Sequence, residues 1–259
     1  MNATLVPGAP GPAPADRGST PAAAPAIDVR DLTKRFGGLT ALDGVSMSAD
    51  TGKVLGIIGV NGAGKTTLMN CICGLYQPDA GTVRIGGQET TGRTPHEVAR
   101  LGVGRTFQVP RVFGRMSLID NLLVPVLSQG GSDAQLRAKA EAMLEQMRLI
   151  DLRHNYAEEL SGGQQKLLEI ARMLMPDPRV VMLDEPFAGV HPLLCTFIIE
   201  RIDAMSAAGK TVLLISHDLT SIYRLSDTLV AMNQGRIIAS GDVEAIRGNR
   251  DVIEAYLGG

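Results

Sequence analysis

The sequence is poor in cysteine, has no excess of either charge and contains no long apolar run, and each absence excludes a class of protein. Cys71, Cys73 and Cys195 are too few for a disulfide framework and lack the C-x-x-C spacing of a zinc site. We therefore expect a reducing compartment, in which these cysteines are small buried hydrophobic residues. The 25 basic side chains nearly balance the 27 acidic ones, so the net charge of −2 provides no global field that would attract nucleic acid.

The sequence also lacks segments that would target the chain to a membrane or carry it across one. No apolar run approaches the roughly 18 to 20 residues that cross a bilayer, so we expect a chain that does not span one itself. The N-terminal stretch is rich in alanine and proline, without the basic region and continuous apolar stretch of a secretory signal. We interpret residues 1–26 as a disordered tail.

What is present from residue 27 onward is the apolar pattern of an α/β fold with a helical insertion. Residues 27–94 and 176–240 contain short β-like segments and nearly continuous apolar runs, which are typical of parallel strands buried on both faces. Residues 95–175 are mostly helical in their spacing, so they predict a helical subdomain inserted into the α/β core. We expect residues 241–259 to form a C-terminal helical extension.

Polar residues follow four of the apolar runs, at the point where each run stops. In open α/β sheets, ligands bind beyond the carboxyl ends of the strands, so we expect these polar endings to converge on one crevice. The four endings are the glycine-rich loop after Val54–Ile58, Asp184-Glu185 after Val180–Leu183, Ser216-His217 after Thr211–Ile215, and Gln108 after Val103–Phe107.

The glycine-rich loop has the form G-x-x-x-x-G-K-[ST], with an apolar run before it and helical residues after it, which favours a phosphate site over an ordinary glycine turn. Its glycines allow successive backbone N–H groups to face an anion, and the following helix adds the positive end of its dipole. We expect Lys65 to reach the β- and γ-phosphates and the Thr66 hydroxyl to ligate Mg²⁺. The predicted nucleotide-binding residues of this loop are Gly59, Asn61, Gly62, Ala63, Gly64, Lys65, Thr66 and Thr67.

Two acidic residues follow the buried run at residues 180–183. Asp184 is placed to hold Mg²⁺ directly or through water, and Glu185 could polarise an attacking water molecule. An acidic pair could also simply end a strand. The glycine-rich loop upstream favours the functional interpretation.

The segment LSGGQ carries a structural signal and a functional one. Ser161 and Gln164 match the S-x-x-Q capping box that begins a helix. A cap does not need Gly162 and Gly163, which weaken the first turn of a helix. The added glycines therefore indicate close approach of the backbone to an anion, as at the glycine-rich loop.

In their order along the chain, these motifs resemble those of ATP-binding cassette (ABC) ATPases. The resemblance extends from about residue 27 to the end of the chain and rests on the P-loop, LSGGQ, "VVMLDE", the lone Gln108 and "ISHD". It implies a P-loop NTPase core with a parallel sheet, an antiparallel β-subdomain and an inserted helical subdomain. It also implies ATP and Mg²⁺ as ligands, and an ATP hydrolase as the activity.

The resemblance assigns roles to individual residues. Two cassettes would close head to tail, so that Ser161, Gly162, Gly163 and Gln164 of one contact the γ-phosphate held by the other, whether the second cassette is an identical copy or a paralogue. Glu185 resembles the catalytic base, His217 the switch histidine, and Gln108 the Q-loop residue that links Mg²⁺ to the partner. Phe36 is similar to the aromatic residue that stacks on adenine. A polar residue starting a helix is the alternative for His217, and a core position is the alternative for Phe36.

Three further segments resemble the ATP-binding subunits of branched-chain amino acid importers, with urea importers close to them. The segments are "PHEVARLGVGRTFQVPRVF" from residue 95, "DEPFAGVHP" from residue 184 and "VIEAYLGG" at the end. The chain departs from that pattern at Val60, where proline is frequent, at His191, where asparagine is common, and in a shorter segment between Asn121 and Leu160. The resemblance implies integral-membrane permeases as partners, an extracytoplasmic solute-binding protein indirectly, and a cytoplasmic location on the inner face of the cell membrane.

Two other classes of ATPase or GTPase compete with this interpretation. ABC-type ATPases that act on nucleic acid or ribosomes usually carry tandem cassettes, long coiled-coil inserts or zinc motifs, and the sequence contains none of these. A P-loop GTPase typically selects guanine with an N-K-x-D segment, which the sequence lacks, and would leave LSGGQ unexplained. A transport ATPase is the leading hypothesis, and the solute that it serves is not encoded in its own residues.

Overall fold

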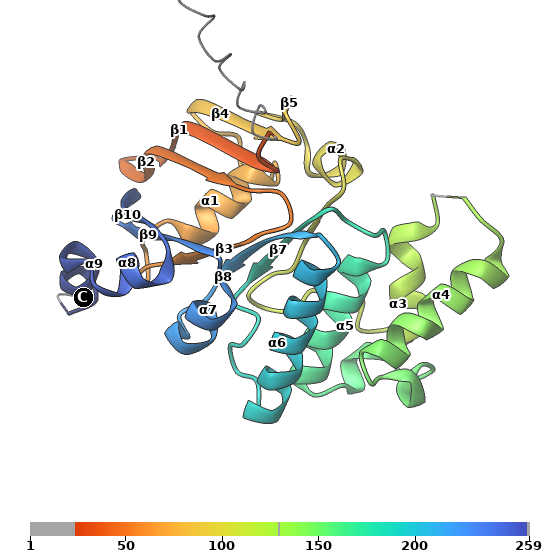
Figure 1. Cartoon of the computed structure of the whole chain (residues 1–259). Coiled ribbons are helices and arrows are strands. Elements are labelled where there is room, and N and C mark those ends of the chain that lie inside the picture. Colours follow the sequence, from red (N-terminus) through yellow and green to blue (C-terminus); the bar gives the residue numbers. More distant parts are fainter. Residues whose placement is uncertain (1–23, 129, 258–259) are drawn as a thin grey trace, which may run out of the picture.

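The computed structural model describes residues 24–128 and 130–257. The predicted tail, residues 1–26, lies outside this description as far as residue 23. Over the described residues the chain forms two β-sheets surrounded by helices (Figure 1). The α/β fold class predicted from the sequence is thereby confirmed.

A four-stranded antiparallel sheet forms one layer, in the spatial order β2-β1-β4-β5. A tight hairpin joins β1 to β2, and Phe36 pairs with Leu39 across its turn. In the second half of β2 buried and exposed residues alternate, so one face of the sheet packs on the core. The strands of this sheet are β1 (Ile27–Phe36), β2 (Leu39–Ala49), β4 (Ala80–Ile85) and β5 (Gln88–Glu89).

A six-stranded sheet forms the centre, in the order β10-β9-β3-β8-β7-β6. The strands from β9 to β6 are parallel, and β10 pairs with β9 in the antiparallel direction. Every residue of β3, β7 and β8 is buried, as expected of parallel strands that are covered on both faces. The strands are β3 (Val54–Ile58), β6 (Val103–Arg105), β7 (Val180–Asp184), β8 (Thr211–Ile215), β9 (Thr228–Asn233) and β10 (Arg236–Gly241).

Different layers cover the two faces of the central sheet. Leu55 and Ile57 share a core with residues of β1, β2, β4 and α1. Val54 and Ile58 share the other core with residues of helices α3 to α7. Figure 1 shows the antiparallel sheet at the top, α3, α4 and α5 at the lower right, and α8 and α9 at the left. The central sheet therefore lies between a layer formed by the antiparallel sheet with α1 and a layer of helices.

The helices begin at residues that suit their N-termini. Thr94, Ser132 and Ser161 each form a complete capping box with a glutamate or glutamine three residues later. The helices are α1 (Lys65–Ile72), α2 (Pro95–Arg100), α3 (Leu118–Leu123), α4 (Asp133–Gln146), α5 (Gly162–Leu174), α6 (Pro192–Ala207), α7 (Leu219–Leu225), α8 (Val243–Arg247) and α9 (Arg250–Leu257). Short 3-10 turns lie at η1 (Val124–Val126), η2 (Ile150–Leu152) and η3 (Ala157–Glu159).

The three cysteines are free thiols. Cys71 in α1 and Cys73 at the C-terminal end of that helix are buried, and Cys195 is partly buried. Burial raises the pKa of Cys71 to about 11, so this thiol stays protonated near neutral pH. The cysteines thus behave as small packing residues.

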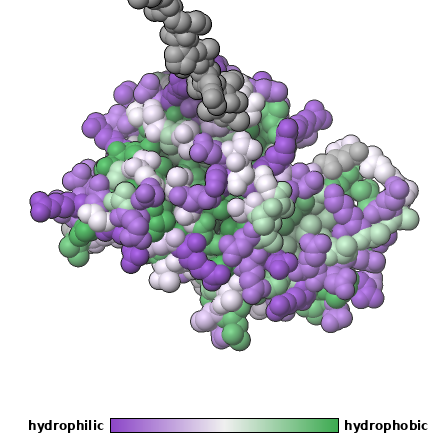
Figure 2. All heavy atoms as spheres, viewed as in Figure 1, coloured by the Kyte–Doolittle hydropathy of each residue, from purple (hydrophilic) through white to green (hydrophobic). Residues whose placement is uncertain are grey.

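Figure 2 shows hydrophilic residues over most of the face in view, interrupted by smaller hydrophobic areas. The described helices are all too short or too polar to cross a bilayer.

Candidate active site

The carboxyl ends of the central strands open into a pocket of about 550 Å³. A neighbouring cavity of about 390 Å³ includes Asp184 and shares Thr66 and Gln108 with the pocket. The sequence-predicted residues that line the larger pocket are Phe36, Asn61, Gly62, Ala63, Gly64, Lys65, Thr66, Thr67, Gln108 and Glu185. Residues from four separate stretches of the chain therefore meet at one edge of the sheet.

Each glycine of the loop between β3 and α1 is required for a different structural reason. A Cβ atom on Gly59 would lie 2.3 Å from the carbonyl oxygen of Met232, and one on Gly64 would lie 2.6 Å from that of Ala41. Gly62 has open space around it and a φ of 81°, a conformation that side chains rarely adopt. Both ends of the loop thus pack closely against the backbone of Met232 and Ala41, whereas its middle is open to the pocket.

Lys65 begins α1 and folds its side chain back over the loop. Its Nζ donates to the carbonyl oxygens of Gly59 at 2.7 Å and Val60 at 3.0 Å. Burial lowers the pKa of Lys65, and the carboxylates of Glu185 and Asp184 oppose this shift. Because Gly64 provides no side-chain cap, the first N–H groups of α1 remain available to an anion.

Asp184 ends β7 with its side chain almost fully buried. Its Oδ2 lies 3.3 Å from Nη2 of Arg105 on β6, whereas its Oδ1 makes no hydrogen bond although it is buried. Burial raises the pKa of Asp184, and the charge of Arg105 is the largest effect that opposes the rise. Thr66 lines the same cavity as Asp184, and its hydroxyl also opposes the rise in the pKa of this carboxyl group.

The oxygen atoms at this point are chemically suited to a divalent cation. A buried carboxylate oxygen without a protein partner and the Thr66 hydroxyl are ligands of the hard type that Mg²⁺ prefers. In the described part of the chain, no three histidine, cysteine or acidic side chains form a metal-binding group. A cation here would therefore take its remaining ligands from water and phosphate, as Mg²⁺ does in nucleotide sites.

Glu185 and His217 follow adjacent parallel strands and contact each other. Glu185 adopts a φ of 50°, which is uncommon for a residue with a side chain, and its N–H donates to the carbonyl oxygen of Ile215 at 3.0 Å. Its Oε2 lies 2.7 Å from His217 Nδ1 and accepts from the His217 backbone N–H at 3.2 Å. The imidazole remains largely exposed and does not itself line the pocket, which it borders through its contact with Glu185.

Gln108 and Phe36 lie at the margins of the pocket. Gln108 follows β6 and borders both cavities, between the phosphate loop and Asp184. Phe36 is 42% exposed and packs edge-on against Tyr76, with ring centroids 5.2 Å apart. This exposure argues against the core alternative for Phe36, whose ring lies at the pocket rim with Lys34 Nζ 5.4 Å from its centroid.

The LSGGQ segment lies apart from this pocket. Ser161 caps α5 by accepting from the Gln164 N–H at 3.4 Å, while Gln164 Oε1 accepts from the Ser161 N–H at 3.0 Å. Ser161 and Gly162 are exposed, and a Cβ atom on Gly162 would contact nothing within 4 Å. The segment is thus a formed helix N-terminus with an open approach, and it does not line the nucleotide pocket of its own chain.

The sequence analysis did not single out two residues that contact the site. Arg105 is buried and joins Asp184 to Asn70, whose Oδ1 accepts at 2.6 Å; a lone arginine within an apolar run was the available signal. Tyr256 of α9 accepts, through its hydroxyl oxygen, the Gly59 N–H at 2.9 Å. This hydrogen bond spans 197 residues of sequence, so no local pattern could have predicted it.

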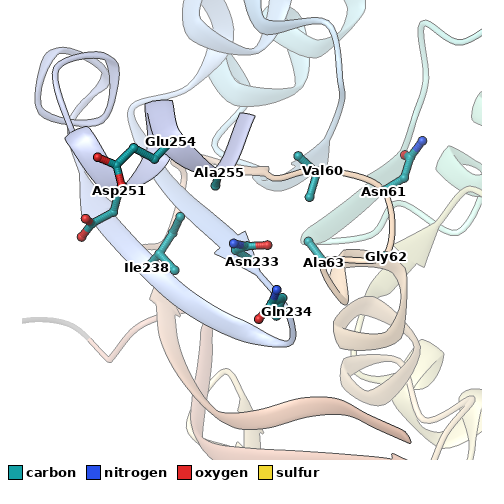
Figure 3. Close-up of a pocket in the computed structure, with 10 residues that line it drawn as sticks. All are labelled: Val60, Asn61, Gly62, Ala63, Asn233, Gln234, Ile238, Asp251, Glu254 and Ala255. Atoms are coloured by element: carbon teal, nitrogen blue, oxygen red, sulfur yellow. The ribbon is translucent and has the colours of Figure 1, made fainter. Parts of the chain in front are cut away.

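A third cavity lies where α9 approaches the glycine-rich loop. It measures about 510 Å³ and opens between the loop, the turn from β9 to β10, and α9 (Figure 3). Val60 and Asn61 contribute from the loop, Gln234 from the turn, and Asp251 and Glu254 from the helix. The C-terminal helix is therefore a neighbour of the nucleotide loop.

Comparison with known proteins agrees with this geometry. Residues 42–188 match the ABC transporter family, and residues 236–259 match the C-terminal part described as a branched-chain amino acid ATP-binding cassette transporter. The chain is 42% identical to the high-affinity branched-chain amino acid transport ATP-binding protein BraF of Pseudomonas aeruginosa, over 90% of this chain and 98% of that one. It is 39% identical to the corresponding protein LivG of Escherichia coli, with the same coverage.

Solved structures give the same result. A nucleotide-free ATP-binding cassette from an ABC transporter superposes with a TM-score of 0.82 and 36% identity, covering 91% of this chain and all of that one. Another cassette, in its ADP conformation, superposes with a TM-score of 0.81 at the same identity and coverage. The chain therefore belongs to the ABC transporter family, as one of its ATP-binding and ATP-hydrolysing cassettes.

Proposed function

We propose that this chain is the ATP-hydrolysing subunit of an importer for branched-chain amino acids. The observation that carries this proposal is the convergence of the phosphate loop, Asp184 and the Glu185–His217 pair on one sheet edge. The names of relatives at 36 to 42% identity support the substrate class. The subunit works with integral-membrane permeases on the cytoplasmic face of the cell membrane, and an extracytoplasmic solute-binding protein delivers the amino acid.

The residues of the pocket have separate roles in binding and hydrolysing ATP. Backbone N–H groups of the loop and the Lys65 ammonium bind the β- and γ-phosphates, and Phe36 stacks on the adenine. Asp184, Thr66 and Gln108 would hold Mg²⁺, which would supply positive charge beside the phosphates. Arg105 opposes the rise in the pKa of Asp184 and contacts its Oδ2 at 3.3 Å, which orients the carboxyl group for this task.

Glu185 and His217 act on the attacking water and on the γ-phosphate. Glu185 accepts the proton of the water, and the left-handed backbone at Glu185 aims its carboxylate away from the strand toward the pocket. His217 holds Glu185 in place through its backbone N–H and its ring, and the ring contacts the γ-phosphate when ATP is bound. Loss of the γ-phosphate then releases the histidine.

We propose that a second cassette, either a copy of this chain or a paralogue, supplies Ser161, Gly162, Gly163 and Gln164 to the phosphates. The exposed N-terminus of α5 supports this arrangement, because its N–H groups and dipole favour an anion. The domain division that we propose assigns residues 27–94 and 176–240 to the nucleotide-binding core, 95–175 to the helical subdomain and 241–259 to the extension. Within 95–175, β6 completes the central sheet, and α3 to α5 form the helical part.

The proposal is tested by expressing the tagged chain with candidate permeases from its genomic neighbourhood and reconstituting the purified complex in vesicles together with the solute-binding protein. We expect two integral-membrane proteins to copurify and ATP-driven uptake of leucine, with no uptake of urea. Uptake of urea instead of leucine would show that the chain is a subunit of a urea importer. Absence of any membrane partner, with intact ATP hydrolysis, would contradict the transport function itself.

A further inference from the structure

Two buried charged residues on α5, Lys166 and Glu169, have no role in the reaction described above. Both side chains are only 2% exposed, and Nζ lies 3.8 Å from Oε2. Burial lowers the pKa of Lys166 and raises that of Glu169, so desolvation outweighs their mutual attraction. Because a buried ion pair is often no more stabilising than apolar residues of similar volume, stability alone does not explain this pair.

Both side chains close on the backbone around Gln108. The Lys166 Nζ donates to the carbonyl oxygens of Phe107 at 2.7 Å and Gln108 at 3.0 Å. Glu169 Oε1 accepts from the backbone N–H groups of Phe107 at 3.2 Å and Arg111 at 2.9 Å. The two side chains therefore hold the chain before and after Gln108, and Glu169 Oε2 is left without a hydrogen bond.

Between Thr106 and Phe107, the hydrogen-bond partners of the backbone change from the central sheet to α5. The Thr106 N–H donates to the carbonyl oxygen of Met182 on β7 at 2.9 Å, and the Thr106 hydroxyl accepts from the Asp184 N–H at 3.3 Å. One residue later, at Phe107, the partners belong to α5. Gln108 thus enters the nucleotide pocket from a backbone attached to both layers.

We propose that Lys166 and Glu169 are positioning residues, which set Gln108 in the nucleotide pocket and make its position follow that of α5. Lys166 lies four residues after Gly162, or about 6 Å along the helix axis at ~1.5 Å per residue. A helix segment of this length moves as a rigid unit, so a ligand drawn to the Ser161 end displaces the Gln108 backbone. The inference rests on the proposed function, which assigns Gln108 to the active site.

The first test measures the backbone directly, in the full chain without nucleotide. Glu169→Gln is nearly isosteric and removes the charge, and Lys166→Met removes the donor. We expect amide hydrogen exchange in residues 106–112 to become roughly tenfold faster in both variants, because their N–H and C=O groups lose charged partners. Glu244→Gln is a control for the loss of a glutamate charge alone, since Glu244 pairs with Arg247 at the same i,i+3 spacing on α8, at 3.9 Å, but on the exposed surface. Exchange in residues 106–112 stays at the wild-type rate in this control.

The second test asks whether the pair acts through Gln108. We expect each variant to lower kcat roughly tenfold while the KM for ATP stays within about twofold, because small misplacements of an active-site group are costly. In a Gln108→Ala background, the same substitutions should cause no further loss. A purely structural role would lower turnover in both backgrounds.

Each outcome has one meaning. Unchanged exchange in residues 106–112, or losses that add to those of Gln108→Ala, would overturn the positioning role and leave the role of Gln108 intact. Full turnover of Gln108→Ala would overturn the assignment of Gln108 and this inference with it. If circular dichroism shows that Lys166→Met is unfolded, Glu169→Gln decides the matter alone.

Discussion

Lys65 and Lys166 hold loops with the same two contacts but lie in different surroundings. Each Nζ donates to two consecutive carbonyl oxygens, at residues 59–60 for Lys65 and at residues 107–108 for Lys166. Both lysines are buried, and burial lowers the pKa of both. The chemistry of the side chain is therefore the same in the two places.

The surroundings decide what each lysine is for. Lys65 lines an open pocket, and Glu185 and Asp184 lie close enough to affect its pKa. Lys166 faces the chain itself, and Glu169 completes the contact by accepting from N–H groups of the same loop. We call Lys65, Asp184 and Glu185 the open cluster, which is suited to binding a ligand. We call Lys166 and Glu169 the closed cluster, which is suited to fixing a segment of the chain.

Removing the base from the open cluster should have the largest effect on the reaction. Glu185→Gln should lower kcat on the order of 100-fold or more, because the attacking water loses its proton acceptor. ATP binding should persist, and an ATP-dependent dimer should become visible by size-exclusion chromatography. The same substitution in the closed cluster, Glu169→Gln, should cost only roughly tenfold. Wild-type turnover of Glu185→Gln would remove Glu185 from its role.

The two lysines themselves give the most direct contrast. Lys65→Met should weaken ATP affinity roughly 10- to 100-fold, because a charged donor to the phosphates is lost. Lys166→Met should leave that affinity within about twofold, since Lys166 does not reach the pocket. Isothermal titration calorimetry with Mg²⁺ measures both. Equal losses of affinity in the two variants would erase the distinction between open and closed clusters.

The N-terminus of α5 tests whether the helix that carries the closed cluster also meets a phosphate. Ser161→Asp keeps a good N-cap but adds a negative charge, which should lower turnover about tenfold by repelling the γ-phosphate of the second cassette. Ser132→Asp is the matched control, because Ser132 forms the same capping box with Gln135 on α4.

Both variants should keep wild-type thermal stability and monomer affinity for ATP. If Ser161→Asp weakens nucleotide binding by the isolated monomer, the placement across the dimer is wrong. If Ser132→Asp lowers turnover equally, the effect belongs to capping in general.

The smallest effect on ATP affinity is expected at the contact between α9 and the glycine-rich loop. Tyr256→Phe removes the acceptor for the Gly59 N–H and should weaken ATP affinity by about fivefold, equivalent to roughly 1 kcal/mol. Tyr223→Phe is a control, since Tyr223 packs against the same apolar core without a contact to the loop. Calorimetry distinguishes the two variants, and identical affinities would show that α9 does not support the loop.

Local sequence was sufficient for the parts of the site that depend on spacing. The glycines around residues 59–64, the lysine after them and the acidic pair at residues 184–185 were predicted because each follows a run of buried strand residues. The capping box at Ser161 was predicted from local spacing as well, because its hydrogen bonds join residues three apart. The α/β fold class followed from the contrast between apolar runs and helical spacing.

Partnerships between distant segments could not be predicted in this way. The contacts of Arg105 with Asp184 and of Tyr256 with Gly59 join residues 79 and 197 positions apart, and Lys166 reaches Phe107 across 59. Each depends on which strands become neighbours and which helix face is buried, and residue spacing does not record either. The sequence by itself thus determined the glycine-rich loop and the acidic pair, because their geometry is set within a few residues. Only the tertiary structure decided that one buried lysine faces a ligand pocket and the other a loop, because the packing of the layers sets the space around each charge.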